Sequence, residues 1–234
     1  MESEKYAGRA IGAMLLVQVL IGAFVNFVIL QPMTAAPGFL VNAAPNAMMV
    51  SLGVVMELGA GALSVAMAIV AWPILRERAR AMAMWIFALA VVGLSLNAAE
   101  NTTILSMLSL SQEYAKVNPG DAAQFELIGK VVRTARYWAH YMKLMVTVAM
   151  FVLLYGAFFR LALIPRALAG FAGLATLLQL VAVTLPVFGQ RINFQLIAPA
   201  GAAFLIVALW LIARGFRAPK GASNHVAAPE PGLA

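Results

Sequence analysis

GRAIGAMLLVQVLIGAFVNFVIL, residues 8–30, is the stretch that decides the fold. Its 23 residues contain a single charge, Arg9, and a helix of this length crosses the roughly 30 Å hydrocarbon core of a bilayer. A segment in lipid must satisfy its own backbone hydrogen bonds, which makes a helix its natural state. We therefore predict a transmembrane helix that is retained rather than cleaved as a signal peptide, and that ends at Gln31-Pro32.

Five more apolar runs of comparable length follow, and together they predict an all-α integral membrane bundle of six transmembrane helices. These runs are Ala47–Trp72, Met82–Leu108, Tyr137–Phe159, Leu168–Phe188 and Leu196–Ala213. We place the membrane domain at residues 1–217 and a disordered cytoplasmic tail, rich in Pro, Gly and Ala, at residues 218–234. The polar stretch Asp121–Arg136 predicts a helix that either stands alone or extends the fourth span.

The composition supports the same class of protein. Hydrophobic residues make up 63% of the chain and charged residues only 11%, with a mean hydropathy of +0.91. Soluble domains, in contrast, have about 45–50% hydrophobic residues and about 25% charged residues. The absence of cysteine excludes disulfides and thiolate metal sites. Phosphate-loop, zinc-protease and serine-hydrolase motifs are also absent, and His140 and His225 are the only histidines. We therefore predict no cofactor and no metal.

Lysine and arginine are distributed unequally between the two sides of the bundle. The first side holds ten of them: Lys5, Arg9, Arg76, Arg78, Arg80, Arg160, Arg166, Arg214, Arg217 and Lys220. The second side holds five: Lys116, Lys130, Arg133, Arg136 and Arg191. The positive-inside rule then predicts that both termini are cytoplasmic. Because these charges lie at the ends of apolar runs, they indicate contact with anionic lipid and argue against a nucleic-acid partner despite the net charge of +7.

Polar residues within the spans form the candidate binding site. A charge in the bilayer costs roughly 2.5–3.5 kcal/mol on insertion scales, so such groups face the bundle interior and find partners. The candidates are Glu57, Asn97, Glu100, Asn101, Arg136, His140 and Lys143.

Helical spacing and depth both bring these candidates together. In the fourth run, Arg133, Arg136, His140, Lys143 and Thr147 are separated by three or four residues, which places them on one helical face. With cytoplasmic termini, the two carboxylates and the cationic residues all fall in the outer half of the bundle. We therefore predict a polar pocket that opens toward the outer face, with two carboxylates opposed by a cationic strip.

The sequence leaves several roles for this cluster open. It could be a structural ion-pair network that fixes helix register. It could instead form a pocket that binds or moves a small solute or protons, with Glu100 as the acceptor and His140 as the group that titrates near neutral pH. An intramembrane enzyme could use the same residues as acid and base. The chain could also be a structural or regulatory partner of another membrane protein, or a homo-oligomer. No nucleophile motif is present, so a non-enzymatic role leads.

Four stretches resemble a bacterial membrane protein family catalogued as domain of unknown function 4386. They are the opening run quoted above, LNAAENTTILSML (96–108), LLYGAFFRLALIPRALAGFAGLA (153–175) and LIVALWLIARGF (205–216). The resemblance implies six helices and a bacterial inner membrane, and it implies no activity. This sequence departs from the family pattern after Pro199, where Ala200 and Gly201 stand in place of an expected acidic residue.

Overall fold

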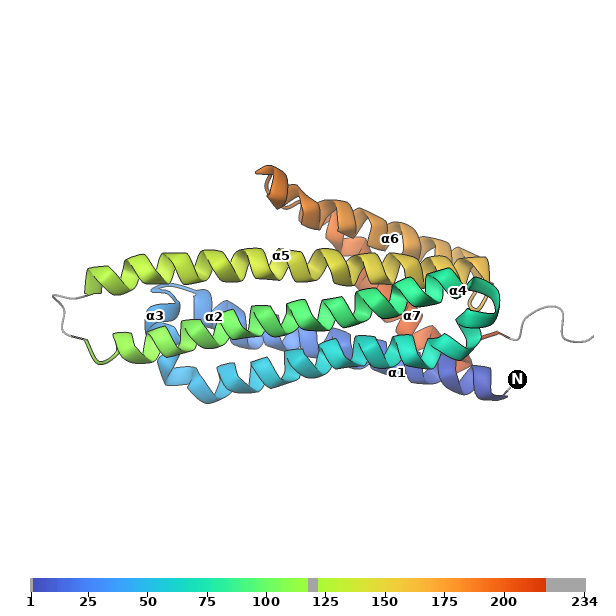
Figure 1. The fold of residues 1–234 in the computed structure, drawn as a ribbon, viewed down its shortest axis with the longest axis horizontal. Coiled ribbons are helices and arrows are strands. Elements are labelled where there is room, and N and C mark those ends of the chain that lie inside the picture. Colours follow the sequence, from blue (N-terminus) through green and yellow to red (C-terminus); the bar gives the residue numbers. More distant parts are fainter. Residues whose placement is uncertain (1, 118–121, 218–234) are drawn as a thin grey trace, which may run out of the picture.

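The computed structural model describes residues 2–117 and 122–217, and every regular element in these residues is a helix, as predicted. Five helices are long and apolar enough to cross a membrane. Figure 1 shows them as an elongated bundle. The elements are α1 (Glu2–Phe24), the π-helix η1 (Val25–Leu30), α2 (Gln31–Thr34), α3 (Phe39–Asn42), the 3-10 helix η2 (Ala44–Asn46), α4 (Ala47–Tyr114), α5 (Ala122–Arg160), α6 (Arg166–Thr184), the 3-10 helix η4 (Leu185–Phe188) and α7 (Phe194–Arg214). The predicted tail at 218–234 lies outside the described residues.

Helix α4 is a hairpin of two limbs that correspond to the second and third predicted spans. Its helical backbone continues through Pro73 and breaks at Ala79, where φ is −148° and ψ is 49°. Figure 1 shows the chain turning at the end of the bundle that carries the N-terminus and then returning beside itself. A proline removes only one helical hydrogen bond, so the helix persists until the backbone reverses within the basic cluster.

Two predicted boundaries are settled by the structure. The first helix does not end at Gln31-Pro32 as predicted, because helical backbone continues through η1 and α2 to Thr34. Pro32 lies in the first turn of α2, where its missing N–H is tolerated. The polar stretch before the fourth span extends that span, because α5 is continuous from Ala122 to Arg160.

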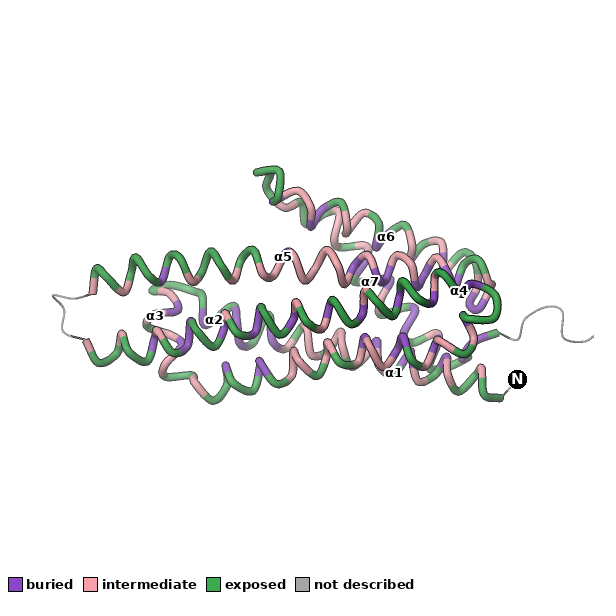
Figure 2. Tube along the Cα trace, in the orientation of Figure 1, coloured by how far each residue is buried: buried purple, intermediate pink, exposed green. Residues whose placement is uncertain are grey.

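Neighbouring helices form a closed ring, in which α1 contacts α4 and α7, α5 contacts α4 and α6, and α6 contacts α7. Figure 2 shows that residues on the outward faces of these helices are largely exposed. Away from the N-terminal end, α6 and η4 diverge from α5 (Figure 1). The far half of the bundle is therefore built from α1, η1, α4 and α5 together with the short helices α2 and α3.

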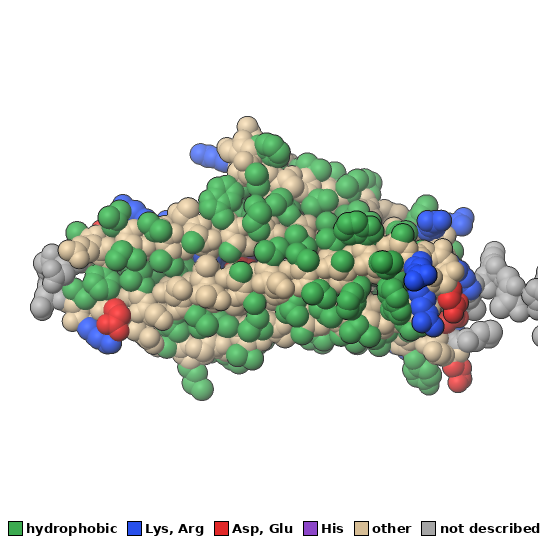
Figure 3. Space-filling model, in the orientation of Figure 1, with side chains coloured by type: hydrophobic (Ala, Val, Ile, Leu, Met, Phe, Trp, Pro, Cys, Tyr) green, Lys and Arg blue, Asp and Glu red, His purple; other side chains and the backbone are tan. Residues whose placement is uncertain are grey.

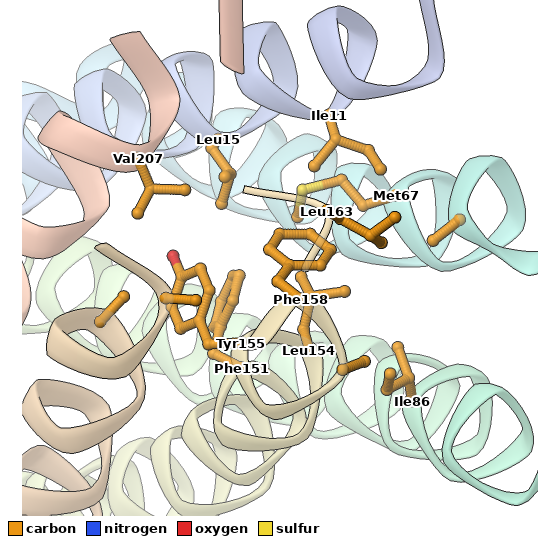
Figure 4. Packing of buried hydrophobic residues seen from close by; sticks show 14 of the residues in the cluster. Ile11, Leu15, Met67, Ile86, Phe151, Leu154, Tyr155, Phe158, Leu163 and Val207 are labelled. Atoms are coloured by element: carbon orange, nitrogen blue, oxygen red, sulfur yellow. The ribbon is translucent and has the colours of Figure 1, made fainter. Parts of the chain in front are cut away.

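Two apolar cores stabilise the bundle, one toward each end. The first core joins α1, α4, α5, α6 and α7, and Figure 4 shows Phe151, Tyr155 and Phe158 of α5 at its centre. The second core joins η1, α2, α3 and both limbs of α4, with Ile29 and Met107 among its buried members. The candidate site residues belong to neither core. Along α4, they lie between the residues that join the first core and those that join the second. We call this set the polar layer, and it consists of Glu57, Asn97, Glu100, Asn101, Arg136, His140 and Lys143.

Candidate functional site

Glu100 is the centre of the polar layer. Its side chain, on the returning limb of α4, is only 3% exposed. Glu100 Oε1 lies 2.8 Å from Nδ1 of His140 and 3.7 Å from Nη2 of Arg136, and its Oε2 lies 2.5 Å from Nζ of Lys143. All three partners come from one face of α5, where the sequence spacing placed them. A buried carboxylate needs such compensation, because its desolvation is otherwise too costly.

The contact with Glu100 also fixes the orientation of the histidine ring. An ionised carboxylate can only accept a hydrogen bond, so Nδ1–H of His140 donates to it. In the neutral ring, Nε2 then carries a lone pair that is available to another donor. The side chain is 29% exposed, so the ion-pair network covers it only in part.

Lys143 connects the two carboxylates. Its Nζ lies 3.3 Å from Oε2 of Glu57 and 3.5 Å from Oδ1 of Asn97, in addition to its contact with Glu100. Both Glu57 and Lys143 are largely buried. Two carboxylates, Glu57 and Glu100, therefore face two basic side chains, Lys143 and Arg136.

The side chain of Asn97 joins the two limbs of α4 at this level, and Asn101 supports it from the same limb. Nδ2 of Asn97 donates to the backbone oxygen of Glu57 at 2.6 Å, and Nδ2 of Asn101 donates to both oxygens of Asn97. Gly61 makes this approach possible, because a Cβ there would lie 2.6 Å from Nδ2 of Asn97. Small residues commonly permit such close helix contacts in membranes.

A cavity of about 210 Å³ lies beside this network. Residues of α1, η1, both limbs of α4 and α5 line it, and none of its lining residues belongs to α6 or α7. Its apolar wall includes Leu89, Leu94 and Met150. Its polar wall is formed by Gln18, Asn26, Glu57, Ser64, Asn97, His140, Lys143 and Thr147.

A second hollow of about 470 Å³ adjoins the cavity on the side of α2. Asn26 and His140 line both spaces, so the histidine ring stands at their junction. Arg136 lines the second hollow only. Glu100 and Asn101 line neither space, because both are buried behind the wall.

Gln18 is a polar lining residue that the sequence analysis missed. Its Nε2 donates to the backbone oxygen of Ala60 at 2.6 Å and to Oγ of Ser64 at 2.8 Å, which fixes α1 against the first limb of α4. The signal was present, since Gln18 is an amide inside an otherwise apolar run. The described residues contain no group of three or more histidine, aspartate or glutamate side chains that could hold a metal ion.

The model of a family described as a domain of unknown function, DUF4386, matches residues 10–215. The chain belongs to this family. The resemblance seen in the four sequence stretches is thus confirmed, and the matched span includes every residue of the polar layer. No curated protein and no solved structure matches the chain.

The departure of this DUF4386 chain from the expected pattern lies away from the site. Ala200, which follows Pro199 where an acidic residue was expected, is fully buried in the first apolar core. Because α7 does not line the cavity, an acid at that position would not belong to the polar wall of this protein. The cavity is therefore formed by α1, η1, α4 and α5.

Proposed function

We propose that this protein is a multi-pass protein of the bacterial inner membrane, with six transmembrane segments and both termini in the cytoplasm. Five helices have the required length and apolarity, and the two limbs of α4 supply one crossing each. Figure 3 supports this placement, because hydrophobic side chains cover the middle of the bundle while Lys and Arg gather at its ends. The excess of cationic residues on the side of the N-terminus favours that side as cytoplasmic.

We further propose that the polar layer binds a small polar solute that enters from the outer face. The observation that carries this proposal is the junction of the cavity with the second hollow at Asn26 and His140. The second hollow reaches Gln31 and Thr34, on the side away from the termini. The cavity of about 210 Å³ has the volume of roughly seven water molecules at about 30 Å³ each. A solute of several non-hydrogen atoms fits this space.

The charges of the wall indicate which solutes suit it. One carboxylate, Glu57, and one ammonium, Lys143, line the cavity, together with side-chain amides and hydroxyls. A neutral or zwitterionic solute meets a donor and an acceptor there without leaving a net charge in the bilayer. His140, hydrogen-bonded to Glu100, provides a group through which a proton could accompany the solute.

The test is a thermal stability screen of the detergent-purified protein with neutral and zwitterionic solutes, including urea, glycerol and glycine. A solute that binds the folded state raises the melting temperature by mass action. We expect a hit to stabilise the wild type and to lose its effect in Glu57→Gln. Glu113→Gln is the matched control, because Glu113 lies on the same helix with its side chain 61% exposed.

Two outcomes distinguish solute binding from a purely structural role of the polar layer. If a solute stabilises the wild type and Glu113→Gln but not Glu57→Gln, the cavity is a binding site. If no solute shifts any of the three proteins and Glu57→Gln is merely less stable, the layer is an ion-pair network that fixes helix register. Uptake of the hit solute into vesicles then distinguishes binding from transport.

An intramembrane enzyme is the second candidate, and the Glu100–His140 pair favours it. The ring is oriented by a buried carboxylate and faces both hollows, as a general acid–base group requires. Overexpression of an enzyme would alter the lipid or metabolite profile of the membrane, and His140→Ala would abolish the change. A role as a partner of another membrane protein predicts co-purification that survives both His140→Ala and Glu57→Gln.

A further inference from the structure

A basic hollow lies at the end of the bundle opposite the second hollow. Lys5 and Arg9, one turn apart on α1, face Arg214 and Arg217 at the end of α7 across a space of about 690 Å³. No acidic residue lines this space. Within residues 2–117 and 122–217, none of these four cations takes part in an ion pair. Four basic side chains therefore converge here, and no carboxylate of the described residues forms an ion pair with them.

The backbone that carries these charges is tightly held. Gly215 ends α7 with a φ of 66°, a conformation that favours glycine. The following residue, Phe216, is 1% exposed and packs edge-on against Phe158 of the first core, with ring centroids 5.1 Å apart. Gly8 of α1 lies so close that a Cβ there would overlap the backbone nitrogen of Phe216. The ends of α1 and α7 are thus locked together.

Arg217 is fixed in the same way. Its backbone N–H donates to the carbonyl oxygen of Leu163 at 2.8 Å, and its guanidinium carbon lies 5.7 Å from the centroid of the Trp210 ring. A cation over an indole face is attracted by the ring quadrupole. Arg217 is therefore directed back over α7 and toward the hollow instead of continuing away from the bundle.

We propose that this hollow binds the headgroup phosphate of an anionic phospholipid. Guanidinium groups match phosphate oxygens in geometry and charge, and basic pockets between helices on the cytoplasmic side suit acidic headgroups. Leu209 and Ile212, one helical turn or less before the lining residues Ala213 and Arg214 of α7, are exposed apolar side chains that acyl chains could contact. This inference rests on the proposed membrane placement. The basic hollow shares no residue with the solute cavity, so lipid binding and solute binding can be disproved independently.

The test titrates the full-length protein, purified in a neutral detergent, with phosphatidylglycerol or phosphatidylcholine while the melting temperature is followed. Phosphatidylglycerol should stabilise the wild type, and phosphatidylcholine should not. Each basic residue near a membrane surface contributes about a fivefold gain in lipid affinity. Arg214→Gln with Arg217→Gln should therefore need roughly 25-fold more phosphatidylglycerol for the same shift.

Two further double variants show whether the effect is specific to the hollow. Arg76→Gln with Arg78→Gln removes the same charge from exposed positions at the same end of the bundle and should keep the wild-type response. Lys5→Gln with Arg9→Gln tests the hollow from the other helix and should weaken the response as Arg214→Gln with Arg217→Gln does. Any one of three results would overturn the proposal. The control variant could lose as much of the response to phosphatidylglycerol as the hollow variants do, phosphatidylcholine could stabilise the wild type equally, or glycerol phosphate alone could give the full stabilisation.

Discussion

Replacing Lys143 by methionine tests the central claim that one ammonium bridges two buried carboxylates. Methionine keeps the length and apolar stem of the side chain and removes its charge. At an effective dielectric constant of about 20, unit charges separated by the observed 2.5 and 3.3 Å attract by about 7 and about 5 kcal/mol. Desolvation offsets much of this gain, and removing one partner of a buried pair costs about 3–5 kcal/mol. Glu100 keeps His140 and Arg136, so we expect the lower value, about 3 kcal/mol.

The assay compares melting temperatures of Lys143→Met and the wild type in the same detergent. For a chain of this size about 1 kcal/mol corresponds to about 2–4 °C, so the expected fall is about 6–12 °C. Lys116→Met is the control, because the Lys116–Glu113 pair is exposed and its loss should cost at most about 1 kcal/mol. Adding Glu57→Gln to Lys143→Met should restore part of the loss, since Glu57, which pairs only with Lys143 among the described residues, is then neutral. Equal melting temperatures for the two lysine variants would refute the reasoning.

Two further substitutions probe packing around the site. Gly61→Ala should lower the melting temperature by several degrees, because its Cβ would press on Nδ2 of Asn97, and overpacking costs about 1–3 kcal/mol. Gly59→Ala, whose Cβ would meet nothing within 4 Å, should be neutral or stabilising by up to about 1 kcal/mol, and a similar loss in both variants would contradict the contact. Tyr155→Phe should leave the melting temperature unchanged or raise it by a few degrees, because the buried hydroxyl has no hydrogen-bond partner among the described residues. A fall of more than about 3 °C, or roughly 1 kcal/mol, would show that the hydroxyl is bonded.

Local patterns in the sequence predicted the helices and much of the site. Apolar length alone located the spans, because a membrane helix is recognised one segment at a time. The periodic spacing of Arg136, His140 and Lys143 predicted their shared face, and all three contact Glu100. Helical periodicity is an internal property of one element, so it does not require knowledge of the neighbours.

Features that depend on contacts between helices were not predictable from the same patterns. The persistence of helix through Pro32 and Pro73 depends on whether the surrounding structure tolerates a missing hydrogen bond. The division of the candidates into cavity wall and buried support depends on the packing of three helices. Glu100 is consequently a supporting residue behind His140, although the sequence analysis gave it the role of acceptor in the pocket itself.

The size of the cavity bears on whether the polar layer exists only for packing. Two oppositely charged residues are enough to fix the register of two helices. Here a space of about 210 Å³ remains beside the ion pairs, and residues without large side chains, Ala60, Gly61 and Gly93, help to line it. A dry cavity of that volume costs on the order of 5 kcal/mol at about 24 cal/mol per Å³. A polar wall avoids this cost when water or a solute occupies the space, so the lining residues favour a filled cavity over a dry one.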